Sequence, residues 1–205
     1  MKPVFVVYGR MNPPTIGHKS LIDVMLGMAR EKGGDAVVVV SHTQDLKKNP
    51  LSAEEKVGLL RQIYPDESAV RILATSKSES SIGHVLAKLK EEGYTDLTLV
   101  LGSDRIADFQ FLLKPFPELK IVSGGERDPD AEDEVSAMSA TKVRAAAMAG
   151  NWNSFRRGIN TAVLNGQLRQ TMKNIRNRLS AAPTKSGKRG GSRRLRPKRK
   201  TVRRR

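Results

Sequence analysis

Residues 4–18 read VFVVYGRMNPPTIGH, and this stretch is the strongest indicator of the fold. Its first five residues form a continuous apolar run rich in valine, which is typical of a strand buried on both faces of a parallel sheet. Gly9 ends the run, two prolines stiffen the turn that follows, and a helix is expected to begin between Thr15 and Gly17. Because the amides of that helix start face the end of the strand, an anion can bind there.

The alternation of apolar runs and helical patterns continues along the chain. Strand–helix alternation implies right-handed crossovers, so the sequence predicts an α/β fold, a Rossmann-like doubly wound parallel sheet of about five strands followed by C-terminal helices. Ligands of such sheets bind outside the carboxyl ends of the strands. Further strands are predicted at residues 36–40, 70–73, 97–101 and 119–122. Helices are predicted at residues 21–29, 52–63, 82–89, 141–149 and 168–179.

The charges are divided unevenly along the chain. The 205 residues include 37 Lys or Arg and 21 Asp or Glu, for a formal net charge of +16. Residues 1–134 hold 17 basic and 21 acidic side chains, a net of −4, and residues 135–205 hold the other 20 basic side chains and no acidic ones. The first part has the charge of an ordinary metabolic enzyme, and the second is suited to meet a polyanion.

The composition excludes some classes of protein. There are no cysteines, so disulfides and thiolate metal sites are excluded. No apolar run approaches the roughly 20 residues of a membrane helix, and Met1-Lys2-Pro3 leads into a strand rather than a signal peptide. A soluble, cytoplasmic protein with no membrane partner is expected.

His18 falls in the first turn of the helix expected after the prolines, where its ring can donate a hydrogen bond to a phosphoryl oxygen. The same stretch is also compatible with an ordinary strand–turn–helix corner, in which Thr15 caps the helix and His18 has no catalytic role. The spacing of these residues by itself leaves both interpretations open.

Residues 9–18 resemble the first signature of the HxGH-type nucleotidyltransferase superfamily, which includes the nicotinamide-mononucleotide, pantetheine-phosphate and glycerol-phosphate nucleotidyltransferases. The family pattern reads G-[RS]-F-x-P-x-[HT]-x-G-H, and Met11 stands here in place of its aromatic residue. The positions that match are Gly9, Arg10, Pro13, Thr15, Gly17 and His18.

Residues 138–144, MSATKVR, look like the second signature of the same family, I-S-S-T-x-x-R. Ser139, Thr141 and Arg144 match, whereas Ala140 lacks the hydroxyl of the family residue. Ser139 is a plausible N-cap, and Arg144 lies one turn beyond Thr141, from where it can reach a phosphate. Taken alone, the segment also fits a capped surface helix with an arginine that faces solvent.

Two more segments are similar to family motifs. Gly102-Ser103-Asp104 follows the fourth strand, where the family often has G-x-D, although Asp104 could simply cap a helix. Residues 48–55 are similar to the segment N-P-[FL]-[ST]-x-x-E-R, and Lys56 stands where arginine is common. Lys47, Lys48 and Asn49 are therefore candidates for contacts with phosphates or the acceptor. The resemblance covers roughly residues 3–150, and phage-encoded members are similar to this chain.

The resemblance implies that an acceptor phosphate oxygen attacks the α-phosphate of ATP or CTP and releases pyrophosphate. Because that phosphate is already anionic, catalysis is expected to consist mostly of positioning and charge stabilisation. His18 and Thr15 are assigned to the α-phosphate, and the second signature to the β- and γ-phosphates. Mg²⁺ is expected to be carried by the phosphates, with no dedicated metal site in the protein. The remaining residues expected at the nucleotide are Gly9, Arg10, Met11, Gly17, Gly102, Ser103 and Asp104.

Three parts are expected: a nucleotidyltransferase-like domain at residues 1–150, a helical extension at 151–180 and a basic tail at 181–205. The tail is too poor in apolar residues to fold alone and is expected to be disordered. It has no aromatic residue, so association with nucleic acid is expected to be independent of base sequence. A solvated tail without a partner is the alternative. Its basic residues are Lys185, Lys188, Arg189, Arg193, Arg194, Arg196, Lys198, Arg199, Lys200, Arg203, Arg204 and Arg205.

Other functions remain open at this point. The chain could be a structural or packaging protein, associated with a virion, that retains the fold and binds nucleic acid through the tail. It could also be an enzyme whose acceptor is itself a nucleic acid.

A phage-encoded protein would be in the host cytoplasm or the virion. The Gly9-Arg10 form of the first motif and the Gly102-Ser103-Asp104 turn favour ATP over CTP, and self-association into a homo-oligomer is common in the superfamily. His42 and His84 are isolated in the sequence and are expected to be structural or exposed.

Overall fold

Strand β1 (Pro3–Gly9) is the central strand of a five-stranded sheet. The computed structural model describes residues 2–66, 68–125, 138–160 and 162–181. The strand order is β3-β2-β1-β4-β5, and all neighbouring strands are parallel. The sheet is therefore doubly wound, as predicted, and its order reverses between β1 and β4, where such sheets bind ligands. The other strands are β2 (Asp35–Val40), β3 (Arg71–Ala74), β4 (Asp96–Leu101) and β5 (Lys120–Ser123).

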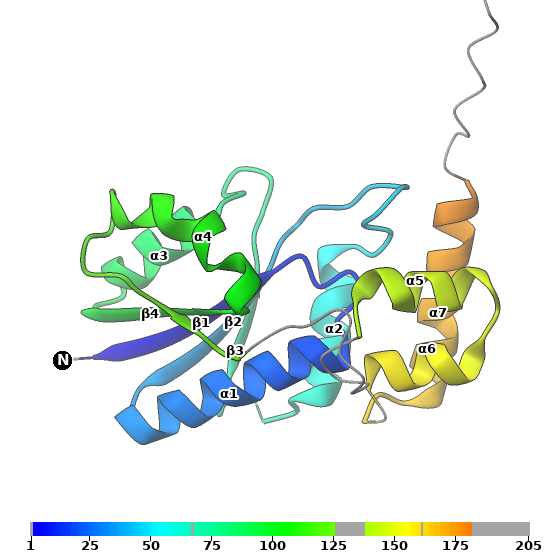
Figure 1. Ribbon diagram of the computed structural model, residues 1–205, viewed down its shortest axis with the longest axis horizontal. Helices are drawn as coiled ribbons and strands as arrows, with labels where there is room; N and C mark the ends of the chain where they lie inside the picture. The colour runs from blue at the N-terminus through cyan, green and yellow to red at the C-terminus, as the bar shows by residue number, and fades with distance from the viewer. Residues whose placement is uncertain (1, 67, 126–137, 161, 182–205) are drawn as a thin grey trace, which may run out of the picture.

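Helices cover both faces of the sheet (Figure 1). Val4 and Val6 of β1 point to one face and pack against α3, whereas Phe5 and Val7 point to the other and pack against α1. This alternation follows from the two-residue period of a strand. The described helices are α1 (Ile16–Lys32), α2 (Ala53–Ile63), α3 (Ile82–Glu91), α4 (Ile106–Phe109), α5 (Ala140–Met148), α6 (Trp152–Ile159) and α7 (Asn165–Ser180).

The three inner strands are buried on both faces, and the two edge strands are less buried than predicted. Most side chains of β1, β2 and β4 are buried, whereas those of β3 and β5 are half-buried or exposed. An edge strand has a neighbour on one side only, so its side chains are covered less completely. Two short 3₁₀ turns, Ser103–Arg105 and Gln110–Leu113, flank α4 after β4.

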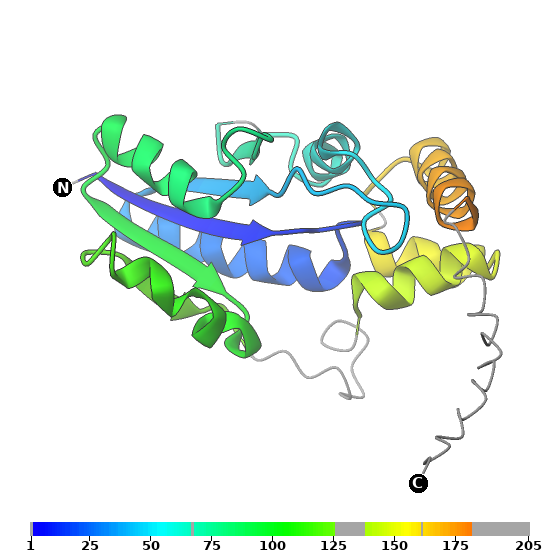
Figure 2. The ribbon, with the colours of Figure 1, turned by 90° about the horizontal axis from the view of Figure 1, so that it is seen from above.

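The C-terminal helices form a third apolar cluster with α2. Phe155, Leu168 and Ile175 are fully buried and pack against Leu51 and Leu59 of the α2 region. Figure 2 shows α5 and α6 beyond the carboxyl end of β1. The expected domain boundary at residue 150 falls between α5 and α6, which share this cluster, and it stays a prediction.

The Arg178 side chain of α7 ties the C-terminal helices to the start of α2. It donates a hydrogen bond to the Pro50 carbonyl at 2.7 Å and forms an ion pair with Glu55 at 2.5 Å. Asn174 donates to the same carboxylate at 2.6 Å. The acidic segment 126–134 and the basic residues of the tail, Lys185 to Arg205, lie outside the described residues. In the described part of the chain, no helix has the length and apolar character needed to cross a membrane.

Candidate active site

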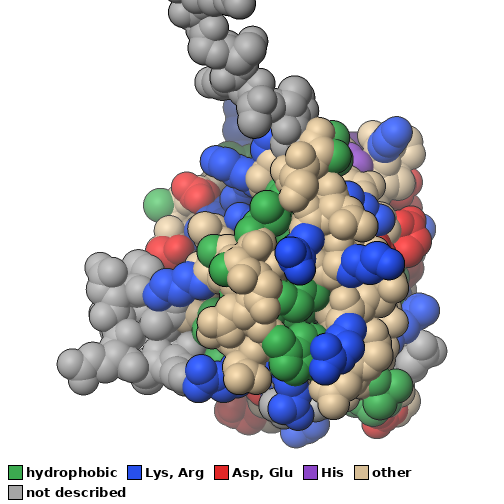
Figure 3. Space-filling view, turned by 90° about the vertical axis from the view of Figure 1, so that its right-hand side faces the viewer, with side chains coloured by type: hydrophobic (Ala, Val, Ile, Leu, Met, Phe, Trp, Pro, Cys, Tyr) green, Lys and Arg blue, Asp and Glu red, His purple; other side chains and the backbone are tan. Residues whose placement is uncertain are grey.

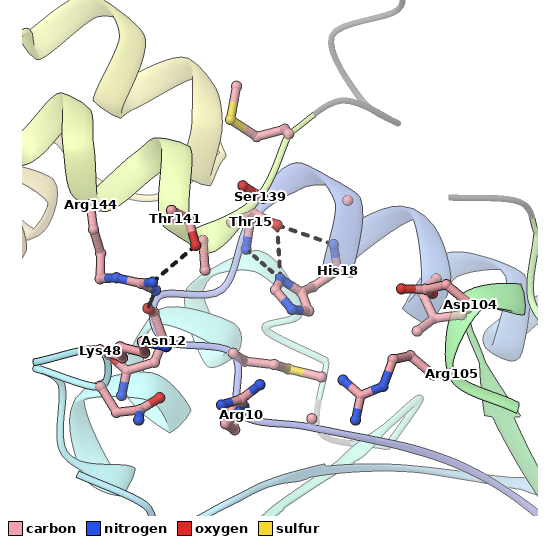
Figure 4. A pocket seen from close by; sticks show the side chains of 18 of the residues that line it. Arg10, Asn12, Thr15, His18, Lys48, Asp104, Arg105, Ser139, Thr141 and Arg144 are labelled. Carbon is pink, nitrogen blue, oxygen red and sulfur yellow. Dashed lines mark hydrogen bonds between the residues drawn. The ribbon is translucent and has the colours of Figure 1, made fainter. Parts of the chain in front are cut away.

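A cavity of about 740 Å³ lies at the carboxyl ends of β1 and β4. It is bordered by the turn after β1, the loop before α2, the turn after β4 and the first turn of α5 (Figure 4). All but one of the residues predicted to contact the nucleotide or a phosphate line this cavity. The exception is Ser103, whose backbone amide donates to the Gly125 carbonyl at 3.2 Å. The candidates that do line it are Gly9, Arg10, Met11, Thr15, Gly17, His18, Lys47, Lys48, Asn49, Gly102, Asp104, Ser139, Thr141 and Arg144.

His18 is held by Thr15, the N-cap residue of α1. The Thr15 hydroxyl lies 2.8 Å from Nδ1 of the imidazole and also accepts a hydrogen bond from the His18 amide. The Thr15 amide donates to the same Nδ1 at 3.1 Å. Because a backbone amide can only donate, Nδ1 is the acceptor, and the proton of the neutral ring is on Nε2. The contacts with Thr15 leave Nε2–H, on the other side of the His18 ring, as a hydrogen-bond donor. A cap formed by Thr15 and a catalytic role of His18 are therefore compatible.

Asn12 fixes the turn that carries these residues, a role that no sequence pattern indicates. Its amide nitrogen donates to the Leu51 carbonyl at 2.8 Å, and its amide oxygen accepts from the Leu51 amide at 2.9 Å. Asn12 is buried, so both side-chain bonds are shielded from water. They join the first motif to the segment just before α2, 39 residues away.

Arg144 joins the second signature to the same turn. Its guanidinium donates to the Asn12 carbonyl at 2.8 Å and to the Thr141 hydroxyl at 3.1 Å (Figure 4). Burial lowers the pKa of Arg144, the nearby Arg10 lowers it further, and Asp45 partly opposes both effects. Arg144 is half-buried and lines the cavity. The alternative interpretation, an arginine that faces solvent from a surface helix, is therefore wrong.

Asp45 orders the loop that presents Lys47 and Lys48. Its carboxylate accepts hydrogen bonds from the amides of Lys47 at 2.8 Å and Lys48 at 2.7 Å, and from the Asn49 side chain at 2.5 Å. These bonds to the charged form lower the pKa of Asp45 to about 2. The carboxylate therefore stays ionised at neutral pH and holds both lysines at the cavity.

The other end of the cavity is partly aromatic. Tyr8 and Phe109 line it and meet edge to face, with ring centroids 6.0 Å apart. Arg105, which the sequence did not single out, lies over the Phe109 ring at 5.6 Å. Burial raises the pKa of Tyr8, while Arg10 and Arg105 act in the opposite direction. Asp104 lies inside a 3₁₀ turn and is not its capping residue, so the capping interpretation of Asp104 is wrong.

The cavity is strongly cationic. Asp104 is the only carboxylate among its described lining residues, which also include five Lys or Arg side chains. The N-termini of α1 and α5 both border it, and Ser139 caps α5 by accepting from the Lys142 amide at 3.2 Å. Two helix starts and five cations favour a ligand with several negative charges, such as a triphosphate.

Three other polar residues lie outside the cavity. His42 is bonded to Thr75, and His84 is exposed and bonded to Ser81, in line with the structural or exposed roles expected for both. Lys56 is fully buried and donates to the Ser41 carbonyl. Within the described ranges, no group of three His, Cys, Asp or Glu side chains could hold a metal ion.

Comparison with known proteins gives a family and a fold. A family model described as cytidylyltransferase-like matches residues 6–146. No curated protein matches the chain.

Three solved structures are similar to the chain, at identities that show a shared fold only. One, provisionally assigned as a nicotinate-nucleotide adenylyltransferase of Vibrio parahaemolyticus, has 20% identity and a TM-score of 0.59, covering 86% of this chain and 96% of that one. The Plasmodium falciparum nicotinic acid mononucleotide adenylyltransferase complexed with NaAD has 16% identity and a TM-score of 0.56, covering 85% and 95%. Its complex with APC has 17% identity and a TM-score of 0.54, covering 85% and 94%.

Proposed function

The chain belongs to the cytidylyltransferase-like family, and on that premise we propose that it is a nucleotidyltransferase. It transfers a nucleoside monophosphate from ATP or CTP to a phosphorylated small-molecule acceptor and releases pyrophosphate. The observation that supports this most is the placement of His18, bonded to Thr15, in one cationic cavity with Arg144.

The proposed reaction is an in-line displacement at the α-phosphorus. An acceptor phosphate oxygen forms a bond to that phosphorus, the bond to the bridging oxygen breaks, and its electron pair leaves with pyrophosphate. The acceptor is already anionic, so no strong general base is required. Nε2–H of His18 donates to an α-phosphate oxygen as negative charge develops there, which is where a positioned donor lowers the barrier.

Residues of the second signature and of the loop before α2 bind the rest of the triphosphate. Arg144 and Thr141 contact the β- and γ-phosphates, together with the amides at the start of α5 that follow Ser139. Lys47 and Lys48 approach the same phosphates from the loop that Asp45 orders. Asp104 is the one cavity carboxylate of the described residues that could contact Mg²⁺ carried by the triphosphate, and that ion would neutralise part of the phosphate charge.

The partly aromatic end of the cavity receives the nucleoside base or the acceptor. Tyr8 and the guanidinium of Arg105, which lies over Phe109, offer flat surfaces for a ring, and Asp104 can accept hydrogen bonds from a ribose or an amino group. The fold shared with nicotinic acid mononucleotide adenylyltransferases makes ATP with nicotinic acid mononucleotide the first pair to test.

A matrix of substrates tests this proposal. Release of pyrophosphate would be measured with ATP and with CTP, each combined with nicotinic acid mononucleotide, a pantetheine phosphate or a glycerol phosphate, in the presence of Mg²⁺. A thermal-shift screen of the same compounds would separate binding from turnover. We expect at least one pair to give turnover; stabilisation by a nucleotide without turnover by any pair would contradict the catalytic assignment.

We also propose that the twelve basic residues of the tail associate with nucleic acid, independently of sequence. Affinity for duplex DNA and for RNA would be measured against salt, with the full chain and with a chain ending at residue 181. Loss of the tail should weaken binding and flatten its salt dependence, because fewer counterions are released. Equal affinities would refute the tail's role. Nucleic-acid binding without turnover would instead favour the packaging protein.

The cytoplasmic location, the similarity to phage-encoded members and a homo-oligomeric state stay proposals. Gel filtration with light scattering would test the oligomeric state directly.

A further inference from the structure

A second groove, of about 420 Å³, lies on the C-terminal helices between the start of α6 and the last turns of α7. We call it the α6–α7 groove and define it by Trp152, Arg169, Lys173, Arg176 and Asn177. It shares no lining residue with the cavity that contains His18. The groove is therefore a separate feature that the proposed reaction does not use.

Three cations follow one stripe of α7 beside this groove. Arg169, Lys173 and Arg176 are spaced by four and three residues, which places them on the same face of a helix, and all three are exposed. Figure 3 shows Lys and Arg side chains spread over this side of the molecule, with Asp and Glu at its margins. The stripe thus presents concentrated positive charge to solvent.

No carboxylate of the described residues forms an ion pair with these three cations. On the sheet domain, by contrast, many surface cations have an acidic partner, such as Arg71 with Glu92 and Lys120 with Asp96. Residues 135–205 contain no acidic side chain, so this part of the chain cannot supply one. Within the described ranges, the charge of the groove is therefore not neutralised by an ion pair.

Trp152 holds Arg169 in place at one end of the groove. The Arg169 guanidinium lies 4.3 Å from the centre of the indole ring, which itself stacks on Phe155. A guanidinium over the face of an aromatic ring is attracted by the ring, and its N–H groups can still contact phosphate oxygens. The covered indole face is not offered to a nucleic-acid base.

The spacing of the cations suits an extended polyanion better than a single phosphate. From Arg169 to Arg176 the helix rises by roughly 10 Å, at 1.5 Å per residue. Duplex DNA carries about one negative charge per 1.7 Å of its axis, so a segment of that length presents about six phosphates. Three exposed cations along the helix can each meet a different phosphate.

We propose that the α6–α7 groove binds the phosphodiester backbone of a nucleic acid, without reading its base sequence. This goes beyond the role proposed for the tail, because it assigns the contact to folded residues of α6 and α7. It does not depend on the reaction proposed for the cavity.

The test compares two double variants of the full chain with equal changes of charge. Lys173→Gln with Arg176→Gln alters the groove and leaves Arg169 on Trp152. Lys88→Gln with Lys114→Gln is the matched control, because both lysines are exposed and belong to the α3–α4 part of the molecule. Affinity for a duplex DNA oligonucleotide and for a single-stranded RNA would be measured over a range of salt. Polyglutamate of similar length would serve as a polyanion without phosphate.

Trp152 provides a second readout, because it is the only tryptophan of the chain. We expect its emission to change on addition of DNA to the wild-type protein and the control, and to change much less in the groove variant. The plot of log affinity against log salt for DNA should be shallower by about two for the groove variant, since each lost phosphate contact removes close to one unit of slope.

Circular dichroism and the thermal midpoint would show that both variants remain folded, and pyrophosphate release would be measured in parallel. Equal slopes for groove variant and control, or a tryptophan signal that DNA does not change, would overturn the proposal. Binding of polyglutamate as tight as that of DNA would overturn the assignment to nucleic acid. None of these outcomes depends on turnover, so a failure of the proposed catalytic function would be seen separately.

Discussion

His18 and Thr15 show how a helix cap can orient a histidine at the edge of a cavity. Thr15 ends the turn and satisfies the His18 amide, while the Thr15 amide fixes Nδ1 as an acceptor. The same contacts leave the proton of the neutral ring on Nε2. One residue pair therefore stabilises the start of α1 and sets the tautomer in which Nε2–H can donate to the ligand of the proposed reaction.

Substitution of His18 tests the donor role proposed for its ring. His18→Ala should lower kcat by about a hundredfold or more, the loss expected when one donor to the transition state is removed. His84→Ala is a matched control, because His84 also lies three residues after the N-cap of its helix and contacts Ser81, but lies outside the cavity. Steady-state rates of pyrophosphate release would measure both. Retention of full turnover by His18→Ala would remove it from the mechanism.

Buried Lys56 is expected to make the free energy of unfolding depend on pH. Burial lowers the pKa of Lys56 to about 8, and Glu54 opposes this weakly. An unfolded lysine titrates near 10.4, so between about pH 8 and pH 10.4 the unfolded chain binds more protons than the folded one. Lys56 therefore destabilises the fold most below pH 8, and this cost decreases as pH rises through that window.

Urea unfolding of the wild type and Lys56→Met, at several pH values between about 7 and 10.5, would measure this effect. The free energy of unfolding of the wild type should rise relative to that of the variant as pH increases. A difference that stays constant with pH would mean that Lys56 keeps its ordinary pKa in the folded protein.

At the scale of the elements, the site is assembled by contacts between segments that are distant in the sequence. Asn12 bonds to Leu51 before α2, and Arg144 of α5 bonds to the Asn12 carbonyl, 132 residues away. α5 is itself held by the apolar cluster that it shares with α2, α6 and α7. The turn after β1, the start of α2 and the start of α5 are thus fixed relative to one another.

Asn12→Ala should loosen this assembly. It removes both side-chain bonds to Leu51 and leaves a buried backbone amide and carbonyl without these partners, at a cost of about 1–3 kcal/mol. Turnover should also fall, because the Asn12 carbonyl positions Arg144. Urea unfolding and kinetics would measure the two effects. Asn153→Ala, at an exposed position of α6, should change stability by less than about 0.5 kcal/mol; a similar loss in both variants would contradict the role of Asn12.

At the scale of the whole molecule, the C-terminal helices α5, α6 and α7 complete the site. They carry Arg144 into the cavity and the groove cations onto the surface. Their apolar cluster includes Leu51 and Leu59 from the region of α2, and Arg178 adds a bond to Pro50 and an ion pair with Glu55. We therefore expect the sheet domain and the C-terminal helices to unfold together.

Two probes of unfolding test this expectation. Trp152 emission reports on the C-terminal helices, and far-ultraviolet circular dichroism reports on the whole fold; their urea midpoints should coincide. Phe155→Ala, which truncates a fully buried ring, should lower both midpoints by a similar amount, for a loss of about 3–5 kcal/mol. Separate transitions, or a shift of the tryptophan signal alone, would show that residues 151–180 unfold independently, as the expected domain boundary implies.

The sequence by itself determined the five strands, the helices that alternate with them and the position of two helix starts at the carboxyl ends of the strands. Apolar periodicity and capping are local patterns, so Val4 to Tyr8 or Ser139 to Arg144 can be interpreted without knowledge of the rest of the chain. Half of the residues that line the cavity were predicted from the sequence, through the resemblance of their motifs to family signatures, and these motifs lie at strand ends and helix starts.

Only the tertiary structure decided how these segments meet. The bonds of Asn12 to Leu51, the loop ordered by Asp45, the approach of Arg105 and the absence of Ser103 from the cavity depend on packing between distant segments. The tautomer of His18 and the exposed stripe of Arg169, Lys173 and Arg176 depend on it as well. A periodic pattern specifies which face of an element is buried, but hydrogen-bond partners and neighbouring charges are set by the elements that pack against it.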